Sequence, residues 1–296
     1  MLLPRIPCRL TFAMSAALAL GAVAAPASAA TTILFVGNSF TYGDPAGAAP
    51  LVRKYRPDTV TDLNGSHLGG VPALFKAFTL QAGLDYEVSL ETAPGKGLDW
   101  HYDNKLATIA KPFDKVVLQS YSTLDGAHPG DPATLVKYSG LLARAFHDRN
   151  PEVDLRLDAT WSRADQTYKP GGAWYGQPIT QMAMDVRAGY DKARLASGLI
   201  NGVIPVGQAW NRAIANGLAD DNPYDGKLIG INLWAPDAYH GSVYGYYLEA
   251  LTIFGSVTGR DPRSLGGGEY VAKDLGIGAA TAAALQQVAA EQLTEQ

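Results

Sequence analysis

The stretch "ILFVGNSFTYG", from Ile33 to Gly43, joins an apolar run to a polar turn. Four apolar residues in succession indicate a strand that is buried on both faces, as in a parallel sheet covered by helices. The stretch "KVVLQ", Lys115–Gln119, begins with a similar continuous run. In open sheets of this type, ligands bind at the carboxyl ends of the strands. Ser39 follows the first run directly, so it is expected at the edge of the sheet where a site would form.

Short apolar runs alternate with longer helical patterns along the rest of the chain. The expected strands are Thr32–Gly37, Tyr86–Glu91, Lys115–Gln119, Val153–Ala159 and Gly202–Val206. The expected helices are Val71–Gln81, Pro132–His147, Ile179–Leu199, a helix that follows His240, and Thr281–Leu293. This order predicts the α/β class, with a three-layer α/β/α architecture and a mainly parallel central sheet of about five strands.

The first 30 residues have the pattern of a secretory signal peptide. Two arginines precede the apolar segment Leu10–Ala25, and Ala27–Ala29 has the small-x-small form of a cleavage site. The alternative is an N-terminal anchor that is not cleaved. We expect residues 1–30 to be removed and residues 31–296 to form a single domain. The protein is then expected in the bacterial periplasm or outside the cell.

Composition excludes several classes of function. The chain of 296 residues has a formal net charge of -4 and no basic run, which argues against nucleic acid as a partner. Its one cysteine, Cys8, lies in the expected signal peptide, so no disulfide is predicted. Neither metal-ligand spacing nor a nucleotide-binding glycine motif is present, so no metal or cofactor is predicted. No later apolar stretch predicts a membrane span, and the oligomeric state is left open.

Ser39 has two interpretations. A serine after a strand can cap a helix, or it can be a nucleophile if a nearby base accepts its proton. Of the five histidines, only His240 has a carboxylate at a spacing that suits a catalytic pair in a compact loop before a helix. Asp237 precedes it by three residues in "APDAYHGS". One imidazole nitrogen could then bind Asp237 while the other faces the serine. The alternative for this pair is a role at the N-terminus of the helix that follows.

Gly-Asn-Ser after the first strand and Asp-x-x-His before a late helix resemble the SGNH (GDSL-like) hydrolases, in the branch whose first block reads Gly-Asn-Ser-Phe-Thr. The resemblance is strongest at "FVGNSFTYG" and "PDAYHGS". It implies a flavodoxin-like hydrolase domain in which Ser39 is the nucleophile, His240 the general base and then acid, and Asp237 the residue that orients His240. Asn38 and Thr41 flank the nucleophile and are expected to support its turn.

The resemblance also implies an oxyanion hole built from a loop glycine and a side-chain amide. Gly95, in "ETAPGKGLDWH", best matches the glycine, with Gly97 as its neighbour. The third block departs from the usual Gly-x-Asn-Asp and reads "KVVLQSYST" instead. Gln119 is the candidate for the second donor, and Ser120 and Tyr121 are alternatives.

The polar stretch Trp161–Gln177 is expected to be a long loop, and loops of this length are often functional. Its aromatic residues are candidates for binding a sugar or another ring: Trp161, Tyr168, Trp174 and Tyr175. The alternative is that these rings only attach the loop to the body of the protein.

The sequence therefore predicts a secreted serine esterase that cleaves carboxylic esters through an acyl-enzyme. The expected substrate is a small-molecule ester or an acylated carbohydrate. Two alternatives remain open: an acyltransferase that acts on glycans, and a glycan-binding module of the same fold without catalysis.

Overall fold

The computed structural model describes residues 1, 2, 4, 29–44 and 50–295. The arginines and the apolar core of the expected signal peptide lie outside these described residues, so signal cleavage stays a prediction. Within the described ranges, no helix is both long enough and apolar enough to cross a membrane.

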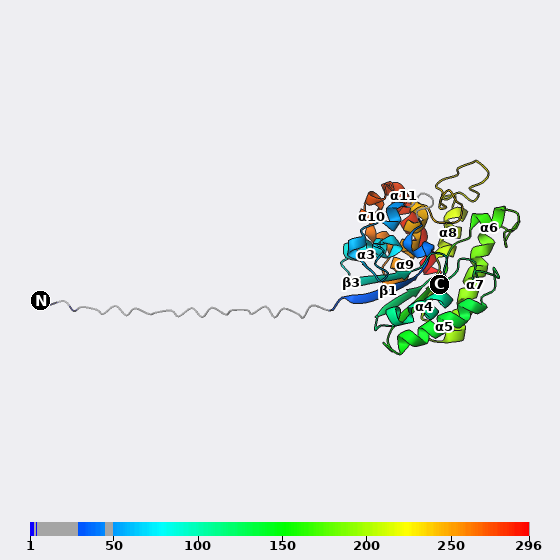
Figure 1. The fold of residues 1–296 in the computed structure, drawn as a ribbon. Coiled ribbons are helices and arrows are strands. Elements are labelled where there is room, and N and C mark those ends of the chain that lie inside the picture. Colours follow the sequence, from blue (N-terminus) through cyan, green and yellow to red (C-terminus); the bar gives the residue numbers. More distant parts are fainter. Residues whose placement is uncertain (3, 5–28, 45–49, 296) are drawn as a thin grey trace.

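Six strands form one parallel sheet in the order β2-β3-β1-β4-β5-β6 (Figure 1). They are β1 (Thr31–Gly37), β2 (Thr61–Asp62), β3 (Tyr86–Thr92), β4 (Lys115–Leu118), β5 (Asp154–Asp158) and β6 (Gly202–Ile204). The short edge strand β2 pairs only with β3. Without β2, the five longer strands have the order 2-1-3-4-5 of flavodoxin-like sheets. Because all pairs are parallel, the carboxyl ends of the strands lie along one edge.

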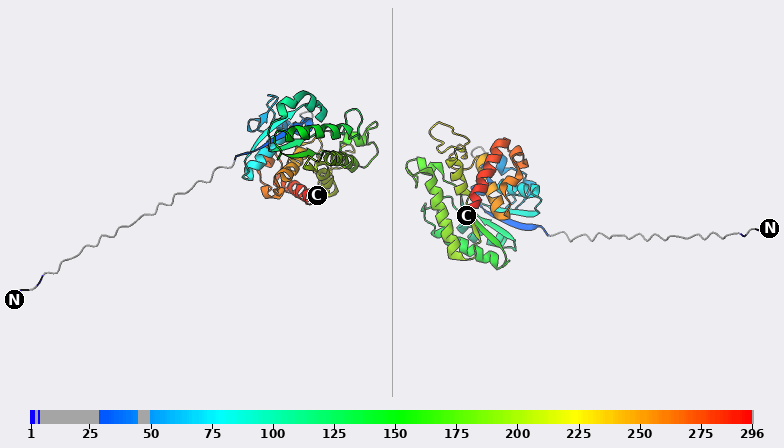
Figure 2. Two further views of the ribbon diagram at one scale, coloured as in Figure 1. Left: turned by 90° about the horizontal axis from the view of Figure 1, so that it is seen from below. Right: turned by 180° about the vertical axis from the view of Figure 1, so that it is seen from behind.

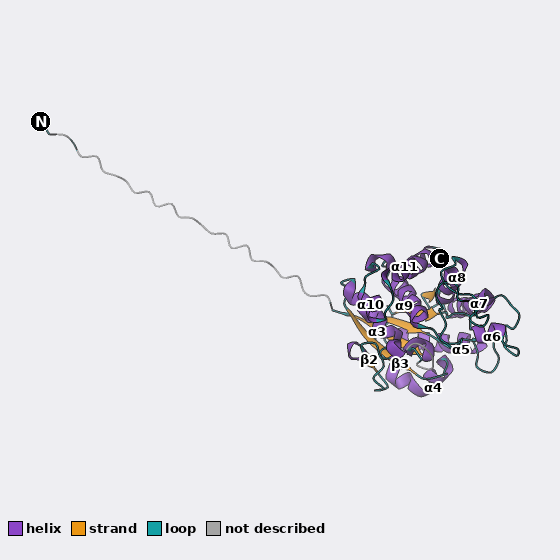
Figure 3. Ribbon diagram, turned by 90° about the horizontal axis from the view of Figure 1, so that it is seen from above, coloured by secondary structure: helices purple, strands orange, loops and turns teal. Residues whose placement is uncertain are grey.

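Helices cover both faces of this sheet. The longer ones are α3 (Gly70–Gln81), α4 (Leu98–Ile109), α5 (Ala133–His147), α7 (Ile179–Ser197), α8 (Val206–Ala215), α9 (Val243–Thr258) and α11 (Ala279–Thr294). The shorter ones are α1 (Ser39–Tyr42), α2 (Pro50–Arg53), α6 (Ala164–Tyr168), α10 (Tyr270–Asp274) and the 3-10 turns Pro57–Thr59 and Pro262–Leu265. Figures 2 and 3 show the strands enclosed between the two helical layers.

Two hydrophobic cores lie on opposite faces of the sheet. Helices α3, α8, α9, α10 and α11 contribute to the first core, and α4, α5 and α7 to the second. Successive side chains of β1 point to opposite faces, so Ile33 and Phe35 enter the first core while Leu34 and Val36 enter the second. This double burial explains why the run from Ile33 is continuously apolar.

The predicted fold class is confirmed. All five expected strands and all five expected helices are present within a few residues of their predicted ends. The sheet has a sixth strand, the two-residue β2, which the sequence did not predict. The helices α4 and α8 were also not predicted. Part of the expected loop Trp161–Gln177 is instead the short helix α6.

Candidate active site

The end of β1 turns sharply to present Ser39. Asn38 caps the four-residue helix α1, and its side-chain oxygen accepts a hydrogen bond from the Phe40 N–H at 3.1 Å. Ser39 is the first residue of this helix and its side chain is almost fully enclosed. Ser39 therefore does not cap α1, because Asn38 is the N-cap residue of this helix. The capping interpretation of Ser39 is wrong, and its hydroxyl is available for another role.

The turn requires glycine at position 37 because its surroundings leave no room for a side chain. A Cβ atom built on Gly37 would lie 2.1 Å from the Thr41 hydroxyl oxygen and 2.7 Å from Oε1 of Gln119. Contacts this short are not seen between real Cβ atoms and their neighbours. Gly37 thus lets the strand approach these two polar side chains closely.

The structure brings together three predicted residues at this turn. The Nε2 atom of His240 lies 2.9 Å from the Oγ atom of Ser39. The Nδ1 atom of His240 lies 2.7 Å from Oδ2 of Asp237. Both distances are those of good hydrogen bonds. Ser39 and His240 are 201 residues apart in the sequence, and they meet because the loop before α9 lies against the carboxyl end of β1.

Asp237 holds His240 through both of its carboxylate oxygens. While Oδ2 binds the imidazole, Oδ1 accepts the backbone N–H groups of Tyr239 and His240, each at 3.0 Å. Burial favours the neutral carboxyl, but the hydrogen bonds from the His240 side chain and from the two backbone groups outweigh it and lower the pKa of Asp237. Asp237 is therefore a carboxylate at neutral pH, and it fixes the proton of His240 on Nδ1.

Helix α9 supports the serine from the other side. The Tyr246 hydroxyl donates a hydrogen bond to the backbone oxygen of Ser39 at 3.2 Å. The same hydroxyl oxygen accepts the N–H of Asp44 at 3.2 Å. Burial raises the pKa of Tyr246 well above its usual value, so the hydroxyl remains a donor. The helix that follows His240 therefore also positions the backbone of Ser39.

The predicted loop glycine follows β3 and belongs to the loop that contacts the Ser39 turn. The Asn38 side-chain nitrogen donates to the backbone oxygen of Lys96 at 2.9 Å, which attaches the loop after β3 to the turn. Gly95 is exposed and has a φ of +64°, a left-handed conformation that favours glycine. Among the described residues, the backbone N–H groups of Ser39 and Gly95 have no hydrogen-bond partner. Both are therefore free to bind a ligand.

Gln119 lies at the predicted place, but its amide is engaged within the protein. Its Oε1 atom accepts the Asn38 N–H at 2.9 Å and the Thr41 hydroxyl at 3.3 Å. Its Nε2 atom contacts the backbone oxygen of Ser120. Because the Asn38 N–H requires an acceptor, the amide cannot be rotated to reverse oxygen and nitrogen. The contacts of its Oε1 atom indicate that Gln119 holds the turn.

The aromatic candidates of the segment 161–177 divide into buried and exposed residues. Trp161 is fully buried and stacks on Trp210 at a centroid distance of 4.3 Å, behind Phe40 of the Ser39 turn. Trp174 is also buried and donates from its indole nitrogen to Asp185 of α7 at 2.8 Å. Both rings attach the segment to the body, as the alternative interpretation predicted, and Trp161 also packs behind the site.

The other two aromatic residues of this segment are more accessible. Tyr175 is 56% exposed. Tyr168 is partly buried, donates to the backbone oxygen of Asp221 at 2.9 Å and packs edge-on against Tyr224. Of the three residues predicted to bind substrate, namely Trp161, Trp174 and Tyr175, only Tyr175 therefore presents its ring to a ligand from outside.

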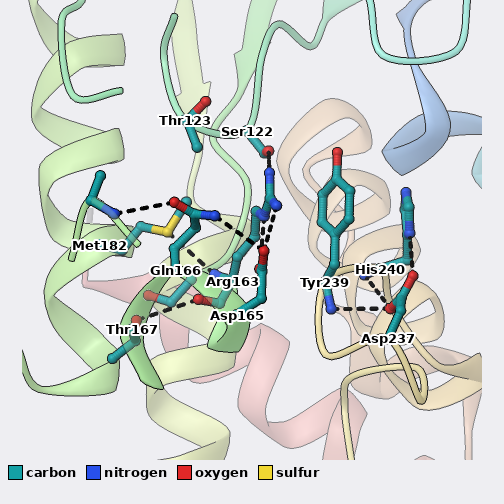
Figure 4. Close-up of polar contacts among 12 residues, drawn as sticks. Ser122, Thr123, Arg163, Asp165, Gln166, Thr167, Met182, Asp237, Tyr239 and His240 are labelled. Carbon is teal, nitrogen blue, oxygen red and sulfur yellow. Dashed lines mark hydrogen bonds and ion pairs between the residues drawn. The ribbon is translucent and has the colours of Figure 1, made fainter. Parts of the chain in front are cut away.

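Three residues near the histidine were not singled out from the sequence. The ring of Tyr239 stacks on His240, and Arg163 lies over the opposite face of Tyr239 (Figure 4). Tyr246 binds Ser39 as described above. Tyr239 could have been identified from the sequence, because it directly precedes His240 in "PDAYHGS". Arg163 has no comparable signal, because its partner is 76 residues away along the chain.

The described part of the chain contains no group of three or more His, Cys, Asp or Glu side chains that could hold a metal ion.

Comparisons with known proteins identify the fold but not the activity. No family model matches the chain, and no curated protein is similar to it in sequence. A solved structure of a DUF4886 family protein from Bacteroides uniformis has a TM-score of 0.58 at 19% identity, over 90% of this chain and 95% of that one. This likeness shows that the two chains share a fold.

Two further solved structures have lower TM-scores. A member of the lipolytic G-D-S-L family from Veillonella parvula has a TM-score of 0.47 at 16% identity, over 77% of this chain and 99% of that one. The family 3 carbohydrate esterase of Clostridium thermocellum has a TM-score of 0.46 at 14% identity, over 76% and 94%. One of these two neighbours is thus named as a member of the lipolytic G-D-S-L family.

Proposed function

We propose that this chain is a serine hydrolase that cleaves carboxylic esters through an acyl-enzyme on Ser39. The observation that supports this proposal is the continuous hydrogen-bonded row from Ser39 through His240 to Asp237, with distances of 2.9 and 2.7 Å. A serine hydroxyl becomes a useful nucleophile when a histidine, held by a carboxylate, can accept its proton. No helix cap or packing role requires this arrangement.

In the first step, Ser39 Oγ attacks the carbonyl carbon of the ester while its proton moves to Nε2 of His240. The imidazolium that forms is stabilised by the Asp237 carboxylate, which does not itself take the proton. The tetrahedral intermediate collapses when the bond to the alcohol breaks and His240 returns the proton to the leaving oxygen. The acyl group is then bonded to Ser39 and the alcohol is free.

In the second step, water attacks the acyl carbon and gives its proton to His240. The bond to Ser39 breaks, the serine oxygen recovers the proton, and the carboxylic acid leaves. Each step forms a negative oxygen on the substrate carbon, and a single donor to this oxygen is worth about 3 kcal/mol. We assign this role to the backbone N–H groups of Ser39 and Gly95, which no described residue binds.

The proposed substrate is a small ester or an acylated carbohydrate, met outside the cytoplasm after removal of residues 1–30. The exposed Tyr175 supports a carbohydrate, because a tyrosine offers an apolar ring and a polar tip to a ligand that has both kinds of surface. The export pattern in the sequence supports an extracellular or periplasmic substrate.

The test is active-site labelling of the mature protein with a fluorophosphonate probe, located by peptide mass mapping, together with hydrolysis of p-nitrophenyl acetate. We expect the label on Ser39, and we expect both label and hydrolysis to disappear in Ser39→Ala and His240→Ala. Wild-type protein that is folded, unlabelled and inactive would contradict the proposal.

The same experiment separates the two alternatives. An acyltransferase would also be labelled on Ser39, but it would pass the acyl group to an added oligosaccharide in preference to water, which product analysis by mass spectrometry detects. A glycan-binding module would take no label and would bind glycans equally well after Ser39→Ala.

A further inference from the structure

The ring of Tyr239 lies between the side chains of Arg163 and His240 (Figure 4). Its centroid is 4.0 Å from that of the His240 ring, with an angle of 30° between the ring planes. The guanidinium carbon of Arg163 is 3.5 Å from the Tyr239 centroid. Arg163, Tyr239 and His240 therefore form one stack that ends at the proposed base, and we refer to these three residues as the Arg–Tyr–His stack.

Arg163 is itself held in place. Its Nε and Nη2 atoms bind the two carboxylate oxygens of Asp165 at 2.9 and 2.6 Å, and its Nη1 atom is 3.5 Å from the Ser122 hydroxyl. The side chains of Arg163 and Asp165 are only 15% and 19% exposed. A planar guanidinium can make this two-point bond and stack on a ring at the same time, which a lysine cannot do.

The backbone next to Arg163 also binds the histidine loop. The N–H of Asp165 donates to the backbone oxygen of Ala238 at 3.2 Å. The indole nitrogen of Trp161 donates to the backbone oxygen of Tyr239 at 3.2 Å. Ala238 has a φ of 58°, a left-handed conformation that is unfavourable for alanine and persists only when its surroundings enforce it. The segment Trp161–Asp165 is thus the surface against which the histidine loop takes its shape.

The imidazole of His240 needs support on its face as well as at its edge. The hydrogen bond to Asp237 fixes one edge of the ring but allows the ring to tilt about that bond. Tyr239 covers one face at 4.0 Å, whereas Phe40 is a more distant and steeply inclined neighbour, at 5.6 Å and 50°. Of these two rings, Tyr239 is the nearer and the more nearly parallel, so it is the one placed to resist tilting of Nε2 away from Ser39.

We propose that Arg163 and Tyr239 are positioning residues for His240, which hold its Nε2 atom in line with the Ser39 hydroxyl through the Arg–Tyr–His stack. This inference rests on the proposed serine hydrolase function. Neither residue touches the ester in this role. Their effect is on the rate of proton transfer from Ser39, and it is independent of which alcohol or acyl group the substrate contains.

A different role for Arg163 is recognition of a negatively charged substrate by its guanidinium. The two roles predict different kinetics. Loss of a positioning residue lowers kcat for a neutral ester and leaves KM unchanged, because the contact acts on the reacting proton. Loss of a substrate-binding arginine raises KM for an anionic ester and leaves kcat for a neutral ester unchanged.

The experiment compares Arg163→Met, Arg163→Lys and Tyr239→Leu with two controls. Tyr239→Phe keeps the aromatic face. Arg263→Met removes an arginine that makes a similar two-point bond to Asp261. Arg263 follows the C-terminus of α9, whereas His240 precedes its N-terminus. For each variant, we would measure the rate of Ser39 labelling by a fluorophosphonate and the kinetics of p-nitrophenyl acetate hydrolysis, and check folding by circular dichroism and thermal melting.

We expect Arg163→Met and Tyr239→Leu to lower both the labelling rate and kcat by about 10- to 100-fold, as small misplacements of catalytic groups do, with KM within about twofold. Arg163→Lys should recover part of the rate, because an ammonium group can still lie over the ring. Tyr239→Phe and Arg263→Met should match wild type.

Three results would overturn the proposal. The first is a folded Arg163→Met that is labelled at the wild-type rate, and the second is a change in KM alone. The third result is an equal labelling rate for Tyr239→Leu and Tyr239→Phe. This comparison decides the matter if Arg163→Met does not fold. Absence of labelling in the wild type would instead contradict the serine hydrolase function, so the two failures can be told apart.

Discussion

The side-chain oxygen of Gln119 accepts the backbone N–H of Asn38 at 2.9 Å, across 81 residues of sequence. This bond joins the residue after β4 to the residue before the proposed nucleophile. The same oxygen also binds the Thr41 hydroxyl at 3.3 Å. One buried amide therefore fixes both ends of the turn in which Ser39 lies.

Replacement of Gln119 by leucine is expected to impair both stability and labelling. Gln119→Leu leaves the buried Asn38 N–H without an acceptor, which should lower the free energy of unfolding by about 1–3 kcal/mol. It should also slow Ser39 labelling, because the turn is no longer held. Urea unfolding and the fluorophosphonate labelling rate measure the two effects. Gln287→Leu, on the exposed side of α11, is the control, and equal effects of the two variants would contradict the role of Gln119.

Replacement of Gly37 by alanine is expected to disrupt the nucleophile turn. The new methyl group would meet Thr41 and Gln119 at distances that force them to move, and overpacking of this kind costs about 1–3 kcal/mol. We expect lower stability in urea unfolding together with loss of Ser39 labelling. Gly140→Ala is the matched control, because a Cβ atom there meets nothing within 4 Å. In the middle of α5 it should stabilise the protein by up to about 1 kcal/mol.

Asp237→Asn tests the carboxylate that orients His240. The asparagine oxygen can still accept the N–H groups of Tyr239 and His240, so the loop should keep its shape. Its NH2 group cannot accept the proton on Nδ1 of His240, which should favour the wrong tautomer. By comparison with other triads, kcat for p-nitrophenyl acetate should fall on the order of 10⁴-fold. Asp103→Asn, at an exposed position of α4, should have no effect; a small effect of Asp237→Asn would refute this role.

A buried pair of carboxyl groups away from His240 should make stability depend on pH. Asp158, at the end of β5, and Glu249, in α9, are both fully buried and lie near enough for their charges to interact. Burial raises the pKa of Asp158 to about 7, and burial together with the neighbouring Asp158 raises the pKa of Glu249 well above its usual value. The folded protein therefore binds protons that the unfolded chain has already released.

The sign of this effect follows from proton linkage. The contribution of the pair to stability is complete below the usual carboxyl pKa of about 4, and it decreases as the pH rises towards about 7. We expect the free energy of unfolding in urea to fall between pH 5 and pH 8, by up to about 1.4 kcal/mol per pH unit for each proton. Glu249→Gln should flatten this slope, whereas Glu87→Gln at an exposed position of β3 should not. Equal slopes in all three proteins would show that the pair does not titrate.

Much of the fold could be predicted because burial leaves a local pattern in the sequence. The continuous apolar run of β1 and the long apolar body of α9 both reflect complete burial. Helix α4 was missed because only Leu98, His101 and Ile109 of its twelve residues are buried, so its apolar pattern is weak. The strand β2 was missed because two residues carry no periodicity, and only pairing with β3 defines it.

The candidate site was predictable where short motifs define it. Ser39, Asp237 and His240 were identified from their immediate neighbours in the sequence, and the structure brings them into contact. The orientation of the Gln119 amide was not predictable, because it depends on Asn38, a distant residue. Trp161 was expected to contact substrate because it belongs to a long segment rich in aromatic residues, but it stacks on Trp210 of the distant helix α8. Contacts between residues far apart in the chain produce no short sequence motif that could reveal them.

The position of His240 directly before α9 determines when the site should be lost on heating. His240 precedes by three residues a helix in which 12 of 16 residues are buried, and such elements open only when the whole domain unfolds. Tyr246, in the first turns of this helix, also holds the serine backbone. The site should therefore not decay before the rest of the molecule, and the temperature at which Ser39 labelling is lost should coincide with the melting temperature.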